Sequence, residues 1–364
     1  STDLGIRAPG RKGVRILGGT NRIDHKKPSW DGSRVNMRNL AAMMLACLLP
    51  LAGAAAAEKE NPEPLRRLRL GVAVGTDETI RDRLEPFREE LEAALDLPVD
   101  LFLMDTLGNV VDALAAGDID YARLSASAYA ATYSLCECVE PLATARPDAF
   151  PARYYALIVS RATERPLTLA DLADGRLGVQ APESVTGYRV PLTNLAAEGT
   201  DARSFFRNLV RMRDPVDGLQ AVLDGRVDAA TAWSTLAGSA ASGYTAGTLN
   251  AFYVSGAPGL ERLKVIWQSP PIPYDAHTVR LSLPDAFKRK LRAALLEMKD
   301  RAPDAYFSIE PDMPGGFEPT VHADYRAVLR TYEPKYQAVL DGGGMPKRPS
   351  AEGAVNPEPE SPSR

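Results

Sequence analysis

Short apolar runs alternate with helical patterns along most of this chain. Residues 69–74 form an apolar run typical of a buried strand. The helix that we predict next has these apolar side chains at helical spacing: Ile80, Leu84, Phe87, Leu91 and Leu95. Strands over 99–104 and 119–124 enclose a helix over 110–117 that ends at a glycine. Such alternation predicts an α/β fold in which mostly parallel sheets are flanked by helices.

The pattern occurs twice. Residues 113–122 resemble residues 221–230, and the Leu-Gly-Val at 70–72 recurs at 177–179. The two motifs keep their order and almost the same offset, which favours two lobes of one topology.

Further elements connect these two lobes. A strand is predicted over 154–160, and strands over 265–268 and 277–280 lead back to the first lobe. An amphipathic helix follows over 285–301, and a second helix over 322–340 is expected to close the first lobe.

We therefore assign residues 66–156 and 269–341 to lobe I and residues 157–268 to lobe II. Two hinge crossings between the lobes predict a cleft that opens and closes. Residues 342–364 are polar and rich in proline, which is typical of a disordered tail.

The N-terminal region has the pattern of an export signal. Residues 37–57 combine a basic residue, a short apolar run and a small-residue end, so we predict cleavage after Ala57 and a periplasmic location. Residues 1–36 are polar and are interpreted as an over-extended gene start. The alternative is a lipoprotein anchored at Cys47, although the apolar run before that cysteine is short.

Composition and charge exclude several classes of function. The chain is 45% hydrophobic and 25% charged, with a formal net charge of −4. Residues 1–57 carry nine basic and three acidic side chains, so the remainder is more acidic than the total suggests. Because an acidic body gains nothing from counterion release, we expect no nucleic-acid partner.

Cysteine and histidine are scarce in the predicted mature chain. Cys136 and Cys138 are expected either as two buried thiols or as a strained bridge. With His277 and His322 as the remaining histidines, too few ligands are present for a metal site, and we predict no metal and no cofactor.

The ends of two predicted strands carry hydroxyl side chains. In lobe II, the strand over 177–180 is followed by Ser184, Thr186 and Gly187. Hydroxyls and free backbone N–H groups at a helix start can bind an anion, and glycine lets the backbone come close to it. An ordinary N-cap and turn is the simpler interpretation of this segment alone.

Lobe I has a matching segment, in which Ser125 and Ser127 open a helix that also carries Tyr129. Since ligands of α/β sheets bind beyond the carboxyl ends of strands, both segments should face one cleft. The sequence therefore predicts an oxyanion site built from uncharged dipoles instead of cations.

Catalytic motifs are missing from the chain. No GxSxG, HExxH, GxxxxGK[ST] or strand-linked GxGxxG pattern occurs. Asp275 and His277 could reach the cleft, but no nucleophile accompanies them, so we predict that the protein is not an enzyme.

An ordered set of motifs resembles the periplasmic substrate-binding proteins of phosphonate/phosphite/phosphate ABC transporters. The motifs are residues 113–120, 127–129, 154–159, 169–175, 184–188, 221–229 and 269–275. The resemblance implies a two-lobed type II periplasmic-binding-protein fold. It also implies a ligand of the phosphonate, phosphite or phosphate class, delivery to an ABC permease, and a monomer.

The same resemblance implies roles for particular residues. Ser184, Thr186 and Gly187 would grip the oxyanion, Tyr154 would form an aromatic wall, and Asp275 would be a polar contact near the hinge. Three further candidates in or near the motifs are Tyr188, Thr235 and Trp233, the last of which could equally belong to the core.

The chain departs from the family pattern at four places, which are Val185, Thr106, Thr235 and the segment 213–216. Val185 removes a hydroxyl from the clamp. Thr235 stands where binders of aminated phosphonates have a glutamate, so the resemblance disfavours 2-aminoethylphosphonate as the ligand. Alternatives are a sensing subunit that signals to a membrane kinase, a receptor for another small oxyanion, and an enzyme on the same scaffold.

Overall fold

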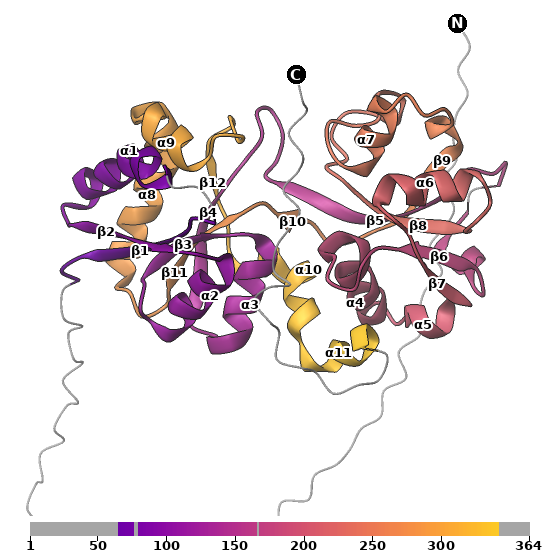
Figure 1. Cartoon of the computed structure of the whole chain (residues 1–364), viewed down its shortest axis with the longest axis horizontal. Coiled ribbons are helices and arrows are strands. Elements are labelled where there is room, and N and C mark those ends of the chain that lie inside the picture. Colours follow the sequence, from indigo (N-terminus) through magenta and orange to yellow (C-terminus); the bar gives the residue numbers. More distant parts are fainter. Residues whose placement is uncertain (1–64, 76–78, 166, 342–364) are drawn as a thin grey trace, which may run out of the picture. The chain divides into compact units, whose positions relative to one another are not determined.

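The computed structural model describes residues 65–75, 79–165 and 167–341. The predicted extension, signal peptide and tail therefore lie outside the described residues. The described part contains two β-sheets, each flanked by helices, as Figure 1 shows. The predicted two-lobed α/β architecture is thus confirmed.

The first lobe is built on a sheet with the strand order β12-β4-β11-β3-β1-β2. Its strands are β1 (Leu68–Ala73), β2 (Val99–Met104), β3 (Tyr121–Leu124), β4 (Val139–Ala145), β11 (Ala276–Arg280) and β12 (Phe317–Pro319). Its helices are α1 (Ile80–Leu95), α2 (Leu107–Ala116), α3 (Ala126–Cys136), α8 (Asp285–Arg301) and α9 (Pro303–Ile309). The five apolar residues predicted for α1 are its buried residues.

The second lobe is built on a sheet with the order β10-β5-β8-β6-β7, with β9 also paired to β5. Its strands are β5 (Arg153–Arg161), β6 (Arg176–Val179), β7 (Asn208–Arg211), β8 (Ala229–Ser234), β9 (Leu263–Gln268) and β10 (Ile272–Pro273). Its helices are α4 (Val190–Ala197), α5 (Ala202–Phe205), α6 (Pro215–Leu223) and α7 (Thr248–Val254). Short helical turns are η1 (Leu169–Leu172), η2 (Val185–Arg189), η3 (Ala240–Ser242) and η4 (Leu260–Arg262).

Both sheets are mixed, so the prediction of mostly parallel sheets holds for only half of each. Strand β1 pairs in parallel with β2 and β3, and β6 pairs in parallel with β7 and β8. The strands near the crossings, among them β11 and β5, pair antiparallel. The apolar patterns predicted strands but carried no information on their direction.

The internal repeat is visible in the parallel half of each sheet. Arg69 in β1 donates from its backbone and its side chain to Asp120, and Nη2 lies 2.6 Å from Oδ1. Arg176 in β6 makes the same set of contacts with Asp228. Each pair ties one strand to the residue that precedes the parallel strand beside it, β3 in the first lobe and β8 in the second, so the two lobes share this local design.

The C-terminal segment corrects the predicted division into lobes. Strand β5 spans the boundary expected after residue 156 and pairs wholly within the second sheet. After β12 the chain passes back to the second lobe, where α11 (Pro334–Asp341) packs against α4. There Leu340 is buried, and its carbonyl accepts hydrogen bonds from Arg203 and Tyr188. The chain therefore crosses between the lobes a third time.

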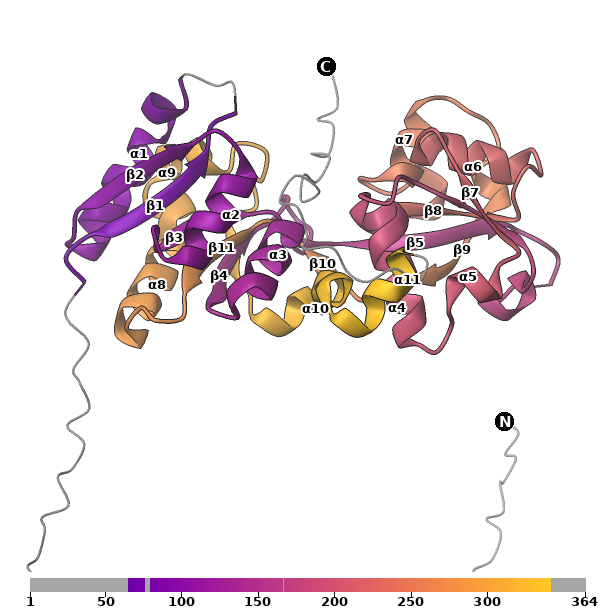
Figure 2. The same ribbon diagram turned by 60° about the horizontal axis from the view of Figure 1, so that its bottom comes forward.

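The helix predicted over 322–340 is broken into four short pieces, which are η5 (His322–Tyr325), α10 (Arg326–Leu329), η6 (Arg330–Tyr332) and α11. Glu333 precedes a proline and is extended, with φ −69° and ψ 128°. A residue before proline is disfavoured in the helical region, which ends the helix there. Figure 2 shows α10 and α11 next to α3 and α4.

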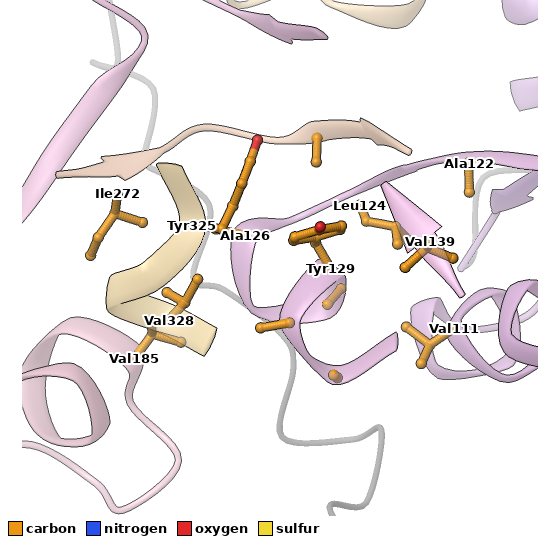
Figure 3. Packing of buried hydrophobic residues seen from close by; sticks show 14 of the residues in the cluster. Val111, Ala122, Leu124, Ala126, Tyr129, Val139, Val185, Ile272, Tyr325 and Val328 are labelled. Carbon is orange, nitrogen blue, oxygen red and sulfur yellow. The ribbon is translucent and has the colours of Figure 1, made fainter. Parts of the chain in front are cut away.

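A buried cluster joins these pieces to both lobes (Figure 3). It contains Tyr129 and Leu124 from the first lobe, Val185 from the second, and Tyr325 from the C-terminal segment. The Tyr325 hydroxyl donates to the carbonyl of Tyr274 in the second crossing. The starts of α3 and η2 therefore rest on one apolar core.

Cys136 and Cys138 form a disulfide, which is one of the two states expected. They do not lie in a strand, because Cys136 ends α3 and Glu137 adopts a left-handed conformation. This turn brings the two Cα atoms to 5.0 Å, closer than residues i and i+2 of a strand. Among the described residues, no helix has the length and apolar character needed to cross a membrane.

Candidate functional site

A cavity of about 610 Å³ is lined by residues of both lobes. From the first lobe it receives Ser125 and Arg123, and from the second Tyr154, Thr186 and Trp233. Tyr274 and Asp275, which link β10 to β11, also line it. One residue of each hydroxyl-bearing segment, Ser125 and Thr186, therefore lines the same cavity.

The lobe I side of this cavity is the start of α3. Ser125 is the N-cap of the helix, and its Oγ accepts a hydrogen bond from the Ala128 N–H at 3.2 Å. Ser127 is buried, with its Oγ 3.3 Å from that of Ser125. A helix start carries partial positive charge, so this end of α3 favours an anion in the cavity.

The lobe II side is the turn that follows β6. Ser184 caps η2, and its Oγ accepts a hydrogen bond from the Gly187 N–H at 3.2 Å. Thr186, which lies between these two residues in the chain, lines the cavity. The Gly187 carbonyl accepts from the Thr231 hydroxyl at 2.8 Å and from the Gln180 N–H at 3.0 Å. Ser184 and Gly187 therefore hold the turn in place, while Thr186 presents its side chain to the cavity.

Substituting Gly187 with alanine should distort this turn. A Cβ at residue 187 would lie 2.2 Å from Gln180 Cγ and 2.8 Å from Ser184 Oγ, closer than side chains pack. We expect Gly187→Ala to lower the free energy of unfolding by about 1–3 kcal/mol and to weaken ligand binding, measured by thermal unfolding and calorimetry. Gly218→Ala, whose nearest contact would be 3.3 Å, is the matched control; equal effects of the two variants would contradict this role of Gly187.

An arginine, which the sequence analysis did not include, also lines the cavity, where its guanidinium is paired with two carboxylates. Arg123 in β3 forms a fork with Glu310, with Nε 2.7 Å from Oε1 and Nη2 3.0 Å from Oε2. Its Nη2 also lies 3.0 Å from Oδ2 of Asp275. The signal for Arg123 was a charged residue inside an otherwise apolar strand, directly before the predicted binding segment.

Glu310 is the buried centre of this network. Burial alone would raise its pKa, but Arg123 and the hydrogen bond from His277 outweigh it and lower the pKa to about 2. His277 Nε2 lies 3.0 Å from Glu310 Oε1, and Nδ1 contacts the Tyr121 hydroxyl. Because the ionised carboxylate only accepts, His277 Nε2 donates the proton of this hydrogen bond.

Three aromatic side chains form another part of the cavity wall. The ring of Tyr154 lies 5.7 Å from that of Trp233 and 5.4 Å from that of Tyr274, measured between centroids. Burial raises the pKa of Tyr274 to about 12, so it remains neutral. These rings pack on one another and offer an apolar surface to the organic part of a ligand.

Six of the ten predicted site residues do not line the cavity. Ser127, Ser184 and Gly187 belong to the two flanking segments, and the other three lie elsewhere. Tyr129 is fully buried in the cluster of Figure 3, and its hydroxyl lies 2.7 Å from Nδ1 of His322. Burial raises the pKa of the Tyr129 hydroxyl. Tyr188 points to the C-terminal segment, where it accepts from Arg203 and donates to the Leu340 carbonyl. Thr235 pairs with Thr245 beside a separate cavity of about 240 Å³. Tyr188 and Thr235 were candidates from the family resemblance and Tyr129 from its place near the helix start, and neither signal shows where a side chain points.

The two lobes, the crossings and the shared cavity define a two-lobed ligand-binding protein. A sequence model described as "ABC transporter, phosphonate, periplasmic substrate-binding protein" matches residues 72–325. The chain belongs to this family. The family consists of transport proteins that bind substrates in the periplasm.

One curated relative agrees with this assignment, and two solved structures share the fold. The phosphonates-binding periplasmic protein of Escherichia coli K12 is 24% identical over 265 residues, which cover 70% of this chain and 71% of the relative. The fold is similar to that of the Xanthomonas citri protein XAC2383 bound to ATP, with a TM-score of 0.50, 15% identity and coverage of 76% and 99% of the two chains. Transferrin 1 of Manduca sexta shares the fold at a TM-score of 0.52 and 11% identity, over 76% of this chain and 47% of transferrin.

Proposed function

We propose that this protein is an extracytoplasmic receptor that binds a phosphonate-type oxyanion in the cavity between its lobes and delivers it to an ABC permease. The observation that carries this proposal is the convergence of Ser125, at the start of α3, and Thr186, in the turn after β6, on one cavity. Hydroxyls and helix-start N–H groups suit an oxyanion from both sides.

This site functions by closing around its ligand. A ligand that contacts both lobes stabilises the form in which both sets of donors are within reach, and it shifts the population toward that form. Each donor segment follows a strand of its own sheet, so movement of either lobe carries its donors with it. A permease that recognises the ligand-stabilised form would then receive loaded protein.

The remaining parts of the proposal follow from export and transport. We propose cleavage after Ala57, residence in the periplasm, action as a monomer and no catalysis. Support comes from the signal pattern of residues 37–57 and from the family, whose members are periplasmic substrate-binding proteins.

Thermal unfolding in the presence of candidate anions tests the function. We expect one or more of phosphate, phosphite, methylphosphonate and other alkylphosphonates to raise the melting temperature, because a ligand that binds only the folded state stabilises it by mass action. Methanesulfonate and acetate, at equal ionic strength, serve as controls. A panel in which no phosphorus oxyanion raises the melting temperature above these controls would contradict the proposal.

A further inference from the structure

The cavity contains an ion pair that its oxyanion chemistry does not use. Arg123 and Asp275 both line the cavity, and Nη2 of the arginine lies 3.0 Å from Oδ2 of the aspartate. The arginine side chain is 37% exposed and the aspartate side chain 27%. The pair is thus accessible from the cavity and adjoins the segments that we propose bind the anion.

Arg123 is held in this position by Glu310, which also lines the cavity. Glu310, whose side chain is 1% exposed, occupies the Nε and Nη2 edge of the guanidinium and is itself bonded to His277. A planar guanidinium with one edge fixed in such a fork has little freedom to turn. The arginine side chain is therefore held beside Asp275 and does not move toward a bound ligand.

This arrangement determines what Asp275 can do. The carboxylates of Asp275 and Glu310, which both line the cavity, already pair with Arg123, so a ligand ammonium beside either would also lie close to the Arg123 charge. Two like charges at such separations repel each other, most strongly where water is partly excluded. The nearby rings of Tyr154 and Tyr274 instead favour an apolar group.

We propose that Arg123 is a specificity-determining residue that reserves the cavity for phosphonates with an uncharged organic group and excludes those that carry an ammonium. The inference rests on the proposed function and narrows its substrate class. Through Arg123, the buried Glu310 and His277 act as positioning residues.

Two ligands of nearly the same shape test this inference. Propylphosphonate and 2-aminoethylphosphonate differ in a terminal methyl against an ammonium, and calorimetry gives the dissociation constant of each. We expect the wild-type protein to bind propylphosphonate at least tenfold more tightly. In the double variant Arg123→Met/Glu310→Gln, which leaves no buried carboxylate unpaired, this preference should fall at least tenfold.

Two further variants complete the test. Asp275→Asn keeps the fork between Arg123 and Glu310 and removes the carboxylate, so the preference for propylphosphonate should increase several-fold. Arg67→Met removes an exposed arginine that pairs with Asp100 in the same lobe and should leave the preference unchanged.

The outcomes separate this inference from the function on which it rests. Equal affinity of the wild-type protein for the two ligands, or an unchanged preference in both the double variant and Asp275→Asn, would overturn the role of Arg123 while the receptor function stands. Failure of the wild-type protein to bind any phosphorus oxyanion would overturn the proposed function and this inference together.

Discussion

Acidification from pH 5 toward pH 2 should remove about 3 kcal/mol of folding free energy through Glu310 alone. The folded-state pKa of this carboxyl is lowered from 4.5 to about 2, by Arg123 and His277 acting against burial. A depressed folded-state pKa stabilises the protein above the unfolded-state pKa. That stability is lost as the pH falls through the window between the two values.

The Glu310→Gln variant isolates this contribution. At neutral pH its free energy of unfolding should be about 3–5 kcal/mol lower than that of the wild-type protein, which is the usual cost of breaking a buried ion pair. Below pH 5 its stability should fall less steeply than that of the wild-type protein. Denaturant unfolding at several pH values measures both effects. Glu140→Gln, at a partly exposed pair with Lys288, is the control; identical acid dependence of wild type and Glu310→Gln would show that Glu310 is not the group responsible.

Replacement of Thr186 with valine should strongly reduce the thermal stabilisation by the true ligand and abolish it at ligand concentrations near the dissociation constant of the wild-type protein. Valine keeps the shape of threonine and removes the hydroxyl of a residue that lines the cavity from the turn after β6. A hydrogen bond to a charged group contributes about 1.5–3 kcal/mol, so the affinity should fall by about 10- to 150-fold.

The unfolding temperature without ligand should change little in Thr186→Val, because Thr186 is only partly buried. Thr200→Val, on the turn after α4, is a matched substitution in the same lobe away from the cavity and should bind as the wild-type protein does. If Thr186→Val retained full affinity, the turn after β6 would not be the anion clamp, although the cavity itself could still bind the ligand.

The local pattern of apolar and polar residues was sufficient to predict helices and strands of the fold. The helical spacing of Phe87 and Leu91 identified α1, and the repeat of Leu-Gly-Val identified β1 and β6 as equivalent strands, each with its Arg–Asp pair. The C-terminal helices were not divided correctly, because periodicity continued through Glu333 while the following proline ended the helix.

The candidate site was predicted in outline only. Ser125 and Thr186 were found because hydroxyls that follow a strand and open a helix form a local signal. Arg123, His277 and Glu310 were not assigned, since their contacts join residues 187 and 33 positions apart in the chain. Tyr129 was placed in the site although its ring is buried, because helical spacing does not show which neighbour covers a side chain.

By itself the sequence determined the two lobes, their internal repeat, the hydroxyl-bearing segments and the family resemblance, all of which depend on residues close together in the chain. Only the tertiary structure decided that the C-terminal segment crosses to the second lobe and that Arg123 is fixed between Glu310 and Asp275. The reason is physical: burial and ion pairing depend on distances between remote residues, and a linear pattern of apolar and polar positions does not specify those distances.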